Sequence, residues 1–146
     1  MRKLIYIMAA LLTLAACGKK PDNKTELTLE QQLCGEWHST SLSIEADIYI
    51  SFAEDKTFEM YQQITEGAHR LYRGTWNLEG TLLTGKYNDG ASWGSGYTVS
   101  ISEDLNSMTL TPSEGSEQVY RRGSIPLEIK TSCIVVVKSE DQSPVL

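Results

Sequence analysis

The chain has 146 residues, with 13 basic and 19 acidic side chains and a formal net charge of −6 at pH 7. A chain of this length corresponds to one domain with a single hydrophobic core. The acidic balance, with no basic block beyond Lys19, Lys20 and Lys24, argues against nucleic acid as a partner.

The chain begins with two basic residues and an apolar run over residues 4–14. A short cationic start and a brief apolar stretch before small residues are typical of a secretory signal peptide, and the run is too short to span a bilayer stably. Leu14-Ala15-Ala16-Cys17 resembles the lipobox of bacterial lipoproteins, in which the cysteine thiol receives a diacylglycerol and becomes the new N-terminus. We therefore expect a signal peptide over residues 1–16 and lipidation at Cys17.

The segment after the cysteine is polar and has no apolar periodicity, so residues 17–26 are expected to form a lipidated, flexible linker. Stable anchoring needs more than one acyl chain, and the resemblance to lipoproteins implies that several are attached. The membrane is therefore an expected partner. Gly18 is not an acid at the position that retains lipoproteins in the inner membrane of well-studied Gram-negative bacteria. This favours the outer membrane and leaves a periplasmic or a surface orientation open.

The first helix signal precedes Gly35. Thr28, with Gln31 three residues later, has the form of a capping box, and Leu29 and Leu33 fall on one helical face. We expect one or two helical turns at this point.

From Gly35 to Arg122 the sequence shows period-two alternation, with turn residues roughly every eight to twelve positions. The expected strands cover residues 35–44, 48–52, 58–64, 72–78, 83–87, 97–101, 108–110 and 118–122. No helix of useful length separates them, so the pattern predicts an all-β, up-and-down antiparallel meander that fits either a sandwich or a barrel.

The pattern changes after the last of these strands. Residues 125–129 predict a short helix with Pro126 in its first turn, and the β-branched residues 134–137 predict a final edge strand. The folded domain is therefore expected over residues 27–137, and residues 138–146 are expected to form a disordered C-terminal tail.

Gly35-Glu36-Trp37 heads the first strand behind the helical turn and resembles the G-x-W signature of the lipocalins and the wider calycin superfamily. Later strings, such as Tyr72-Arg73-Gly74-Thr75-Trp76, are similar to small bacterial lipocalin-like lipoproteins. The resemblance implies a closed eight-stranded barrel whose one end is plugged by the helical turn. It also implies that a basic residue late in the barrel, Arg121 or Arg122, packs over the face of Trp37, a contact worth about 0.5 to 2 kcal/mol.

An eight-stranded barrel has an interior just large enough to be filled by side chains or to hold one small ligand. The large side chains expected to line a ligand are Phe58, Met60, Trp76, Tyr87, Trp93 and Tyr97. The resemblance implies a protein that binds a small apolar or amphipathic molecule. The alternative is a non-enzymatic interaction module that binds an envelope protein or a glycan through its loops or outer face.

Trp93 lies in a loop rich in glycine and serine, an unusual position for a side chain of this size. It either forms a lid or stacking platform at the barrel mouth or folds back onto the rim as additional core. A buried Trp93 that lines a void would favour the ligand-binding protein, and an exposed Trp93 beside a packed interior would favour the interaction module.

No catalytic constellation is visible. The only histidines, His38 and His69, have no metal-ligand spacing and are expected to face solvent, and no G-x-S-x-G elbow occurs. We therefore expect a protein that is not an enzyme and carries neither a metal nor a cofactor. We also expect it to be a monomer.

Cys34 and Cys133 remain after lipidation of the first cysteine, an even pair in an oxidising compartment. A disulfide between them would enclose almost the whole domain and contribute about 4 to 5 kcal/mol on the chain-entropy model. Two free thiols are the alternative, because sequence alone does not fix the distance between the two Cα atoms.

Overall fold

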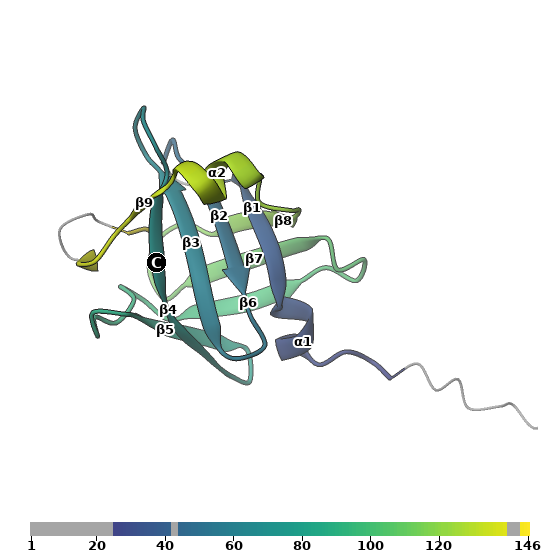
Figure 1. Cartoon of the computed structure of the whole chain (residues 1–146). Coiled ribbons are helices and arrows are strands. Elements are labelled where there is room, and N and C mark those ends of the chain that lie inside the picture. Colours follow the sequence, from purple (N-terminus) through teal and green to yellow (C-terminus); the bar gives the residue numbers. More distant parts are fainter. Residues whose placement is uncertain (1–24, 42–43, 140–143) are drawn as a thin grey trace, which may run out of the picture.

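The computed structural model describes residues 25–41, 44–139 and 144–146 (Figure 1). The expected signal peptide, the lipidation site Cys17 and most of the expected linker lie outside these residues. The elements, in chain order, are α1 (Leu29–Leu33), β1 (Gly35–Ser41), β2 (Asp47–Phe52), β3 (Thr57–Gln63), β4 (Arg70–Glu79), β5 (Leu82–Tyr87), β6 (Tyr97–Ile101), β7 (Ser107–Pro112), β8 (Gln118–Arg122), α2 (Leu127–Ser132) and β9 (Ile134–Val135).

Strands β1 to β8 form a closed antiparallel barrel. Each strand pairs with its neighbour in sequence, and β1 pairs with β8 from Trp37↔Arg122 to Ser41↔Val119, which closes the ring. Closure leaves neither the first nor the last strand of the meander with an unpaired edge. The predicted eight-stranded barrel is therefore confirmed, and the sandwich is excluded.

The interior is built by the period-two alternation of the strands, which places every second side chain on one face. The β2–β3 register sets Ile50 opposite Met60 and Phe52 opposite Phe58, and all four side chains are buried. The largest side chains buried in this core include Trp37, Tyr72, Tyr120, Phe52 and Phe58. Much of the barrel is thus filled by its own side chains.

Helix α1 covers one end of the barrel, as expected. The Thr28 hydroxyl accepts a hydrogen bond from the Gln31 backbone N–H at 3.2 Å, and the Gln31 side chain accepts one from the Thr28 N–H at 2.9 Å. Leu33 is fully buried in the core, and its carbonyl accepts the indole N–H of Trp37 at 2.9 Å. The capping box therefore begins a helix whose last residue is fixed to the core.

Helix α2 packs against the outside of the barrel wall. Ile125, just before the helix, is buried with Tyr61 and Leu71, two strand residues outside the main core cluster. Pro126 is the N-cap of α2 and precedes its first turn, and the final strand is shorter than expected because β9 pairs with β4 only at Ile134 and Val135. Among the residues that the structure describes, no helix combines the length and hydropathy needed to cross a membrane.

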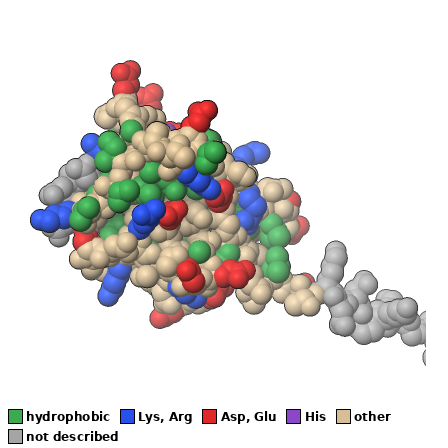
Figure 2. Space-filling model, viewed as in Figure 1, with side chains coloured by type: hydrophobic (Ala, Val, Ile, Leu, Met, Phe, Trp, Pro, Cys, Tyr) green, Lys and Arg blue, Asp and Glu red, His purple; other side chains and the backbone are tan. Residues whose placement is uncertain are grey.

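Hydrophobic side chains gather over α2 and β9 on one face of the molecule (Figure 2). The exposed large residues of these two elements and the segment after them are Leu127, Ile134, Val135 and Val137, the last with 80% of its surface accessible. These four side chains leave apolar surface exposed on this face.

Of residues 138–146, which are expected to form a disordered C-terminal tail, the structure describes residues 138, 139 and 144–146. The backbone N–H and hydroxyl of Ser139 donate to the carboxylate of Asp89, at 2.6 and 2.8 Å. Leu146 is only 3% exposed and belongs to the barrel core. Ser139 thus binds an exposed turn of the barrel, whereas Leu146 packs in the interior, and both contacts join residues that are far apart in the chain.

The expected disulfide between Cys34 and Cys133 is not formed, and both residues are free thiols. Cys34 caps α1 and packs against the interior core, whereas Cys133 caps α2 and packs against the cluster on the outside of the wall. The barrel wall thus separates the two environments.

We expect a reducing agent to leave the thermal midpoint of the domain unchanged. Burial, with Glu54 and Glu30 nearby, raises the pKa of Cys34, so less of this thiol is thiolate at a given pH and its alkylation accelerates only at alkaline pH. Iodoacetamide labelling at a series of pH values from neutral to alkaline, followed by mass spectrometry, measures the rate of alkylation. The unfolded chain is the control. A native mass lower by two hydrogens than that of the reduced chain would contradict the prediction.

Candidate functional site

The barrel wall has a seam between β5 and β6. These strands pair only through Leu82↔Thr98 and Leu83↔Tyr97, whereas β4 and β5 pair along their full common length. Beyond these two pairs the loop over residues 88–96 takes the place of a strand. The backbone N–H of Trp93 donates to the Gly85 carbonyl at 3.0 Å and so pairs the loop with β5. The seam, defined as β5 together with this loop, is therefore closed by irregular backbone.

A tight turn directs the loop back along β5. Gly90 has a φ of 89°, and its N–H donates to the Tyr87 carbonyl at 2.9 Å. The Asp89 carboxylate accepts the Ala91 N–H at 3.0 Å, and the pKa of Asp89 is lowered by the N–H groups of Ser139 and Ala91. An Asp-Gly pair supplies both the side-chain acceptor and the positive φ that such a turn needs.

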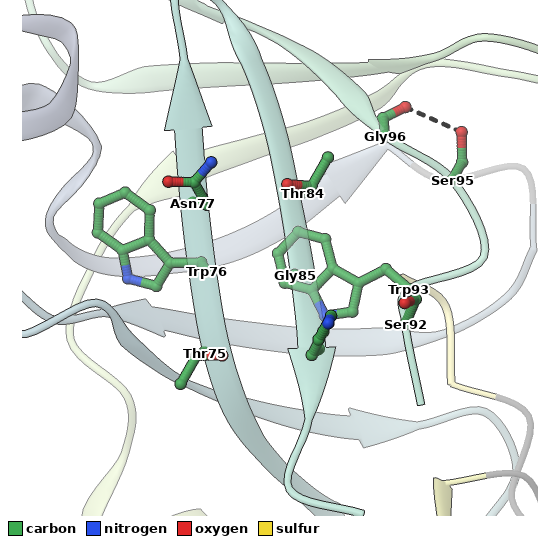
Figure 3. A pocket seen from close by; sticks show the side chains of 10 residues that line it. Thr75, Trp76, Asn77, Thr84, Gly85, Ser92, Trp93, Ser95 and Gly96 are labelled. Carbon is green, nitrogen blue, oxygen red and sulfur yellow. Dashed lines mark hydrogen bonds between the residues drawn. The ribbon is translucent and has the colours of Figure 1, made fainter. Parts of the chain in front are cut away.

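A pocket of about 460 Å³ opens at the seam, a volume that suits a small molecule (Figure 3). Trp76 of β4 and Trp93 of the loop both line it, and Gly85 lies between them on β5. The remaining lining comes from β4, β5 and the loop and is rich in hydroxyl-bearing side chains, including Thr84 and Ser92. The pocket thus combines aromatic surface with polar groups.

Trp93 points into the barrel rather than into solvent and is only 6% exposed. Its ring meets Phe58 and Tyr97 edge-on, with centroid separations of 5.1 and 6.2 Å. Gly85 makes this possible, because a Cβ at that position would lie 2.3 Å from the Trp93 ring. The indole therefore occupies the space that a side chain at position 85 would fill.

The indole N–H of Trp93 is buried and has no hydrogen-bond partner among the residues described. The other two tryptophans are satisfied: Trp37 donates to the Leu33 carbonyl, and Trp76 donates to the backbone of Ala53 and Thr57. A buried donor without an acceptor costs about 1 to 3 kcal/mol. The residue that carries this unpaired donor also lines the pocket.

Trp76 is held rigidly as the second aromatic wall. The N–H bonds of its indole to the β2–β3 turn measure 3.0 and 3.2 Å, and the Lys56 ammonium lies 4.3 Å from its ring centroid. Phe52 packs edge-on against it, at 5.8 Å between centroids. These contacts hold the Trp76 ring in one position beside the pocket.

The six residues expected to line a ligand lie together in one buried core cluster. Of these, Trp76 and Trp93 reach the seam pocket. The others pack in the interior away from its lining: Phe58, Met60, Tyr87 and Tyr97.

Arg122, rather than Arg121, lies over Trp37, with its guanidinium carbon 4.0 Å from the ring centroid. Arg121 is exposed and pairs in register with His38. Gly35 is required beside this contact, because it has a φ of 129° and a Cβ would lie 2.5 Å from the Arg122 guanidinium. The glycine of the G-x-W pattern thus leaves room for the arginine.

Sequence reasoning missed a polar cluster on the outer wall. His38 and His69 contact the two carboxylate oxygens of Asp47, at 2.6 and 2.9 Å, and His38 stacks on Tyr49. The expectation of solvent-facing histidines is wrong for His69, whose side chain is only 12% exposed. No local pattern joins these residues, because His38 lies on β1, Asp47 on β2 and His69 just before β4, and only the fold brings them together. Neither this cluster nor any other group of three or more His, Cys, Asp or Glu side chains in the described part of the chain is arranged so that it could hold a metal ion.

Replacing Gly85 by alanine is expected to destabilise the fold by about 1 to 3 kcal/mol, because the added methyl group displaces the Trp93 ring. The displaced indole should also shift its fluorescence emission to longer wavelength. Gly94→Ala is the matched control, since a Cβ there meets nothing within 4 Å. Urea unfolding followed by intrinsic fluorescence measures both effects, and equal midpoints for the two variants would show that Gly85 is not needed for space.

Comparison with known families agrees with this geometry. The model of the lipocalin-like domain family matches residues 33–111, more than half of the chain. An NMR structure of a protein from Bacteroides uniformis ATCC 8492 is similar in fold, with a TM-score of 0.50 and 19% identity, over 66% of this chain and 93% of that chain. No curated protein sequence matches the chain. The closed barrel, the G-x-W residues and the family match together show that the chain belongs to the lipocalin-like domain family.

Proposed function

We propose that this protein is a lipid-anchored, extracytoplasmic lipocalin-like protein that binds one small amphipathic molecule in the seam pocket. The observation that carries the proposal is the state of Trp93, which is buried, lines the pocket and has an indole N–H without an acceptor in the described structure. A bound molecule that carries an oxygen acceptor would complete this hydrogen bond.

The lining defines the chemistry of the ligand. Trp76 and Trp93 offer apolar ring surface, which suits a flat or aliphatic body, while Thr84 and Ser92 provide hydroxyl groups. A molecule with an apolar body and one carbonyl, hydroxyl or carboxylate oxygen satisfies both parts. Lys86 borders the same pocket and favours a ligand with a negative charge.

The outer face supports a second candidate, the non-enzymatic interaction module. An exposed Trp93 would favour this module, but the Trp93 side chain is buried. The specific observation in its favour is the exposed apolar surface over α2 and β9, which includes Leu127 and Val137. Such a surface suits contact with another envelope protein, and the two functions use different parts of the molecule.

We also propose attachment to the outer membrane through Cys17, with the domain acting as a monomer. The support is the sequence Leu14-Ala15-Ala16-Cys17 and the polar segment that separates it from α1. Labelling of cells with a radioactive fatty acid tests this assignment. Incorporation into the wild-type protein and loss in Cys17→Ser is the expected result, and equal labelling of both would refute the anchor.

The ligand proposal is tested with protein purified from its own host and examined by native mass spectrometry. We expect a bound small molecule that is lost on denaturation. Titration with the amphipathic probe 1-anilinonaphthalene-8-sulfonate then compares the wild type with Trp93→Phe, which keeps an aromatic ring and removes the N–H donor. Loss of one hydrogen bond is expected to weaken binding about tenfold.

Tyr49→Phe is the control, since it removes a hydroxyl from the outer wall at a distance from the pocket lining. Its affinity for the probe should equal that of the wild type. Equal affinity of Trp93→Phe and the wild type, together with no co-purified molecule, would refute the seam pocket as the binding site.

A further inference from the structure

The end of the barrel opposite α1 is occupied by the chain itself. This open end is formed where β3 and β5 end and where β6 and β8 begin. Residues 144–146 lie there, and Leu146 is buried in the core cluster while Val145 packs against it (Figure 1). The segment enters a space that the strands alone leave unfilled.

Side chains from four strands bind the backbone of two consecutive residues. The Val145 N–H donates to the Gln62 side-chain oxygen at 2.8 Å, and the Val145 carbonyl accepts the Tyr97 hydroxyl at 3.2 Å. The Gln118 side-chain amide lies 3.5 Å from the same carbonyl, and the Tyr87 hydroxyl donates to a main-chain oxygen of Leu146 at 2.7 Å. Three of these four contacts are to the N–H and carbonyl of Val145 and the fourth is to a main-chain oxygen of Leu146, so the polar groups at the open end bind main-chain atoms of the segment.

These polar groups are built into the barrel interior rather than placed on its surface. Gln62, Tyr87 and Tyr97 are all buried. Burial raises the pKa of both tyrosines, which keeps their hydroxyl groups protonated as donors. Toward residues 145 and 146 this set presents one acceptor, the Gln62 side-chain oxygen, beside three donors.

A donor next to two acceptors is the pattern of a peptide backbone, and an apolar cavity below it accepts a branched side chain such as that of Leu146. An acyl chain with a carboxylate offers the acceptors but has no N–H for Gln62. A second hollow of about 190 Å³ borders Gln62 on the same rim and gives room for further residues of a peptide. The open end therefore fits a peptide better than a fatty acid.

We propose that the open end of the barrel is a recognition site for a short apolar peptide, and that residues 144–146 are an internal occupant which such a peptide replaces. None of its four polar side chains lines the seam pocket. The peptide site is thus separate from the ligand site proposed above.

The test uses the chain without residues 144–146 and the synthetic peptide acetyl-Pro-Val-Leu, followed by two-dimensional NMR of the ¹⁵N-labelled protein. We expect saturable shifts of the Gln62 and Gln118 side-chain amide signals in the shortened chain. In the intact chain, the internal segment competes at high effective concentration, and binding should be at least about tenfold weaker.

Two probes distinguish the ligand classes. Acetyl-Pro-Val-Asp carries a charge in place of the buried leucine, and hexanoate carries an apolar chain and a carboxylate without a backbone N–H. Both should bind more weakly than acetyl-Pro-Val-Leu. Absence of saturable shifts in the shortened chain, equal binding by the intact chain, or tighter binding of hexanoate would overturn the proposal.

A second pair of variants covers the case in which the shortened chain does not fold. Leu146→Asp in the full chain places a charge in the core and should release the segment, so that this variant binds the peptide. Leu27→Asp changes an exposed residue just before α1, at the other end of the barrel, and should bind no better than the wild type. Equal behaviour of the two variants would also overturn the proposal.

Discussion

Arg122→Lys is expected to lower the free energy of unfolding by about 3 kcal/mol. The guanidinium donates to three backbone carbonyls, those of Leu105 at 2.9 Å, Cys34 at 3.0 Å and Gln32 at 2.5 Å, while it lies over Trp37. Lysine keeps the charge but presents a single ammonium group, which cannot reach all three acceptors and stack on the ring. Urea denaturation followed by far-UV circular dichroism measures the change.

Arg121→Lys is the matched control for this experiment, since Arg121 is adjacent in sequence and exposed. A surface substitution of this kind should change stability by no more than about 0.5 kcal/mol. If the two variants unfolded at the same urea concentration, the arginine over Trp37 would not be what holds α1 against the barrel end.

Trp93→Ala is expected to destabilise the domain by about 3 to 5 kcal/mol, because it removes a buried ring packed on Phe58, Tyr97 and Gly85 and leaves a cavity. Trp93→Phe should cost far less, since it keeps most of the packing and removes a donor that has no partner in the described structure. Thermal and urea unfolding of the ligand-free protein measure both.

Trp37→Phe provides the comparison for the second of these effects. That substitution breaks the buried bond between the Trp37 indole and the Leu33 carbonyl, so it should cost at least about 1 kcal/mol more than Trp93→Phe. Equal losses of unfolding free energy in the two variants would mean that the indole N–H of Trp93 finds an acceptor in solution even without a ligand.

Local pattern was enough to predict the strands and the first helix. Alternation along β2 and β3 identified Ile50, Phe52, Phe58 and Met60 as inward residues, and all are buried. The Thr28 capping box likewise predicted where α1 begins. These features depend on residues within a few positions of each other, where the geometry of a strand or helical turn decides which side chains face together.

The G-x-W resemblance predicted an arginine over Trp37 but left two adjacent candidates. The structure selects Arg122, which lies two residues after the buried Tyr120 and thus on the same face of β8. The same resemblance implied a ligand-binding barrel. It did not locate the seam pocket, because the gap depends on how few residues of β5 and β6 pair.

The sequence by itself determined the all-β class, the strand order along the chain, the capped helix and the identity of the large core residues. Only the tertiary structure decided that Trp93 enters the barrel beside Gly85, that Asp47 joins His38 and His69, that Cys34 and Cys133 stay apart, and that Leu146 fills the open end. The physical reason is distance along the chain. Contacts within a turn or a strand are set by backbone geometry, whereas contacts between remote segments depend on closure of the barrel and on which buried groups remain to be satisfied.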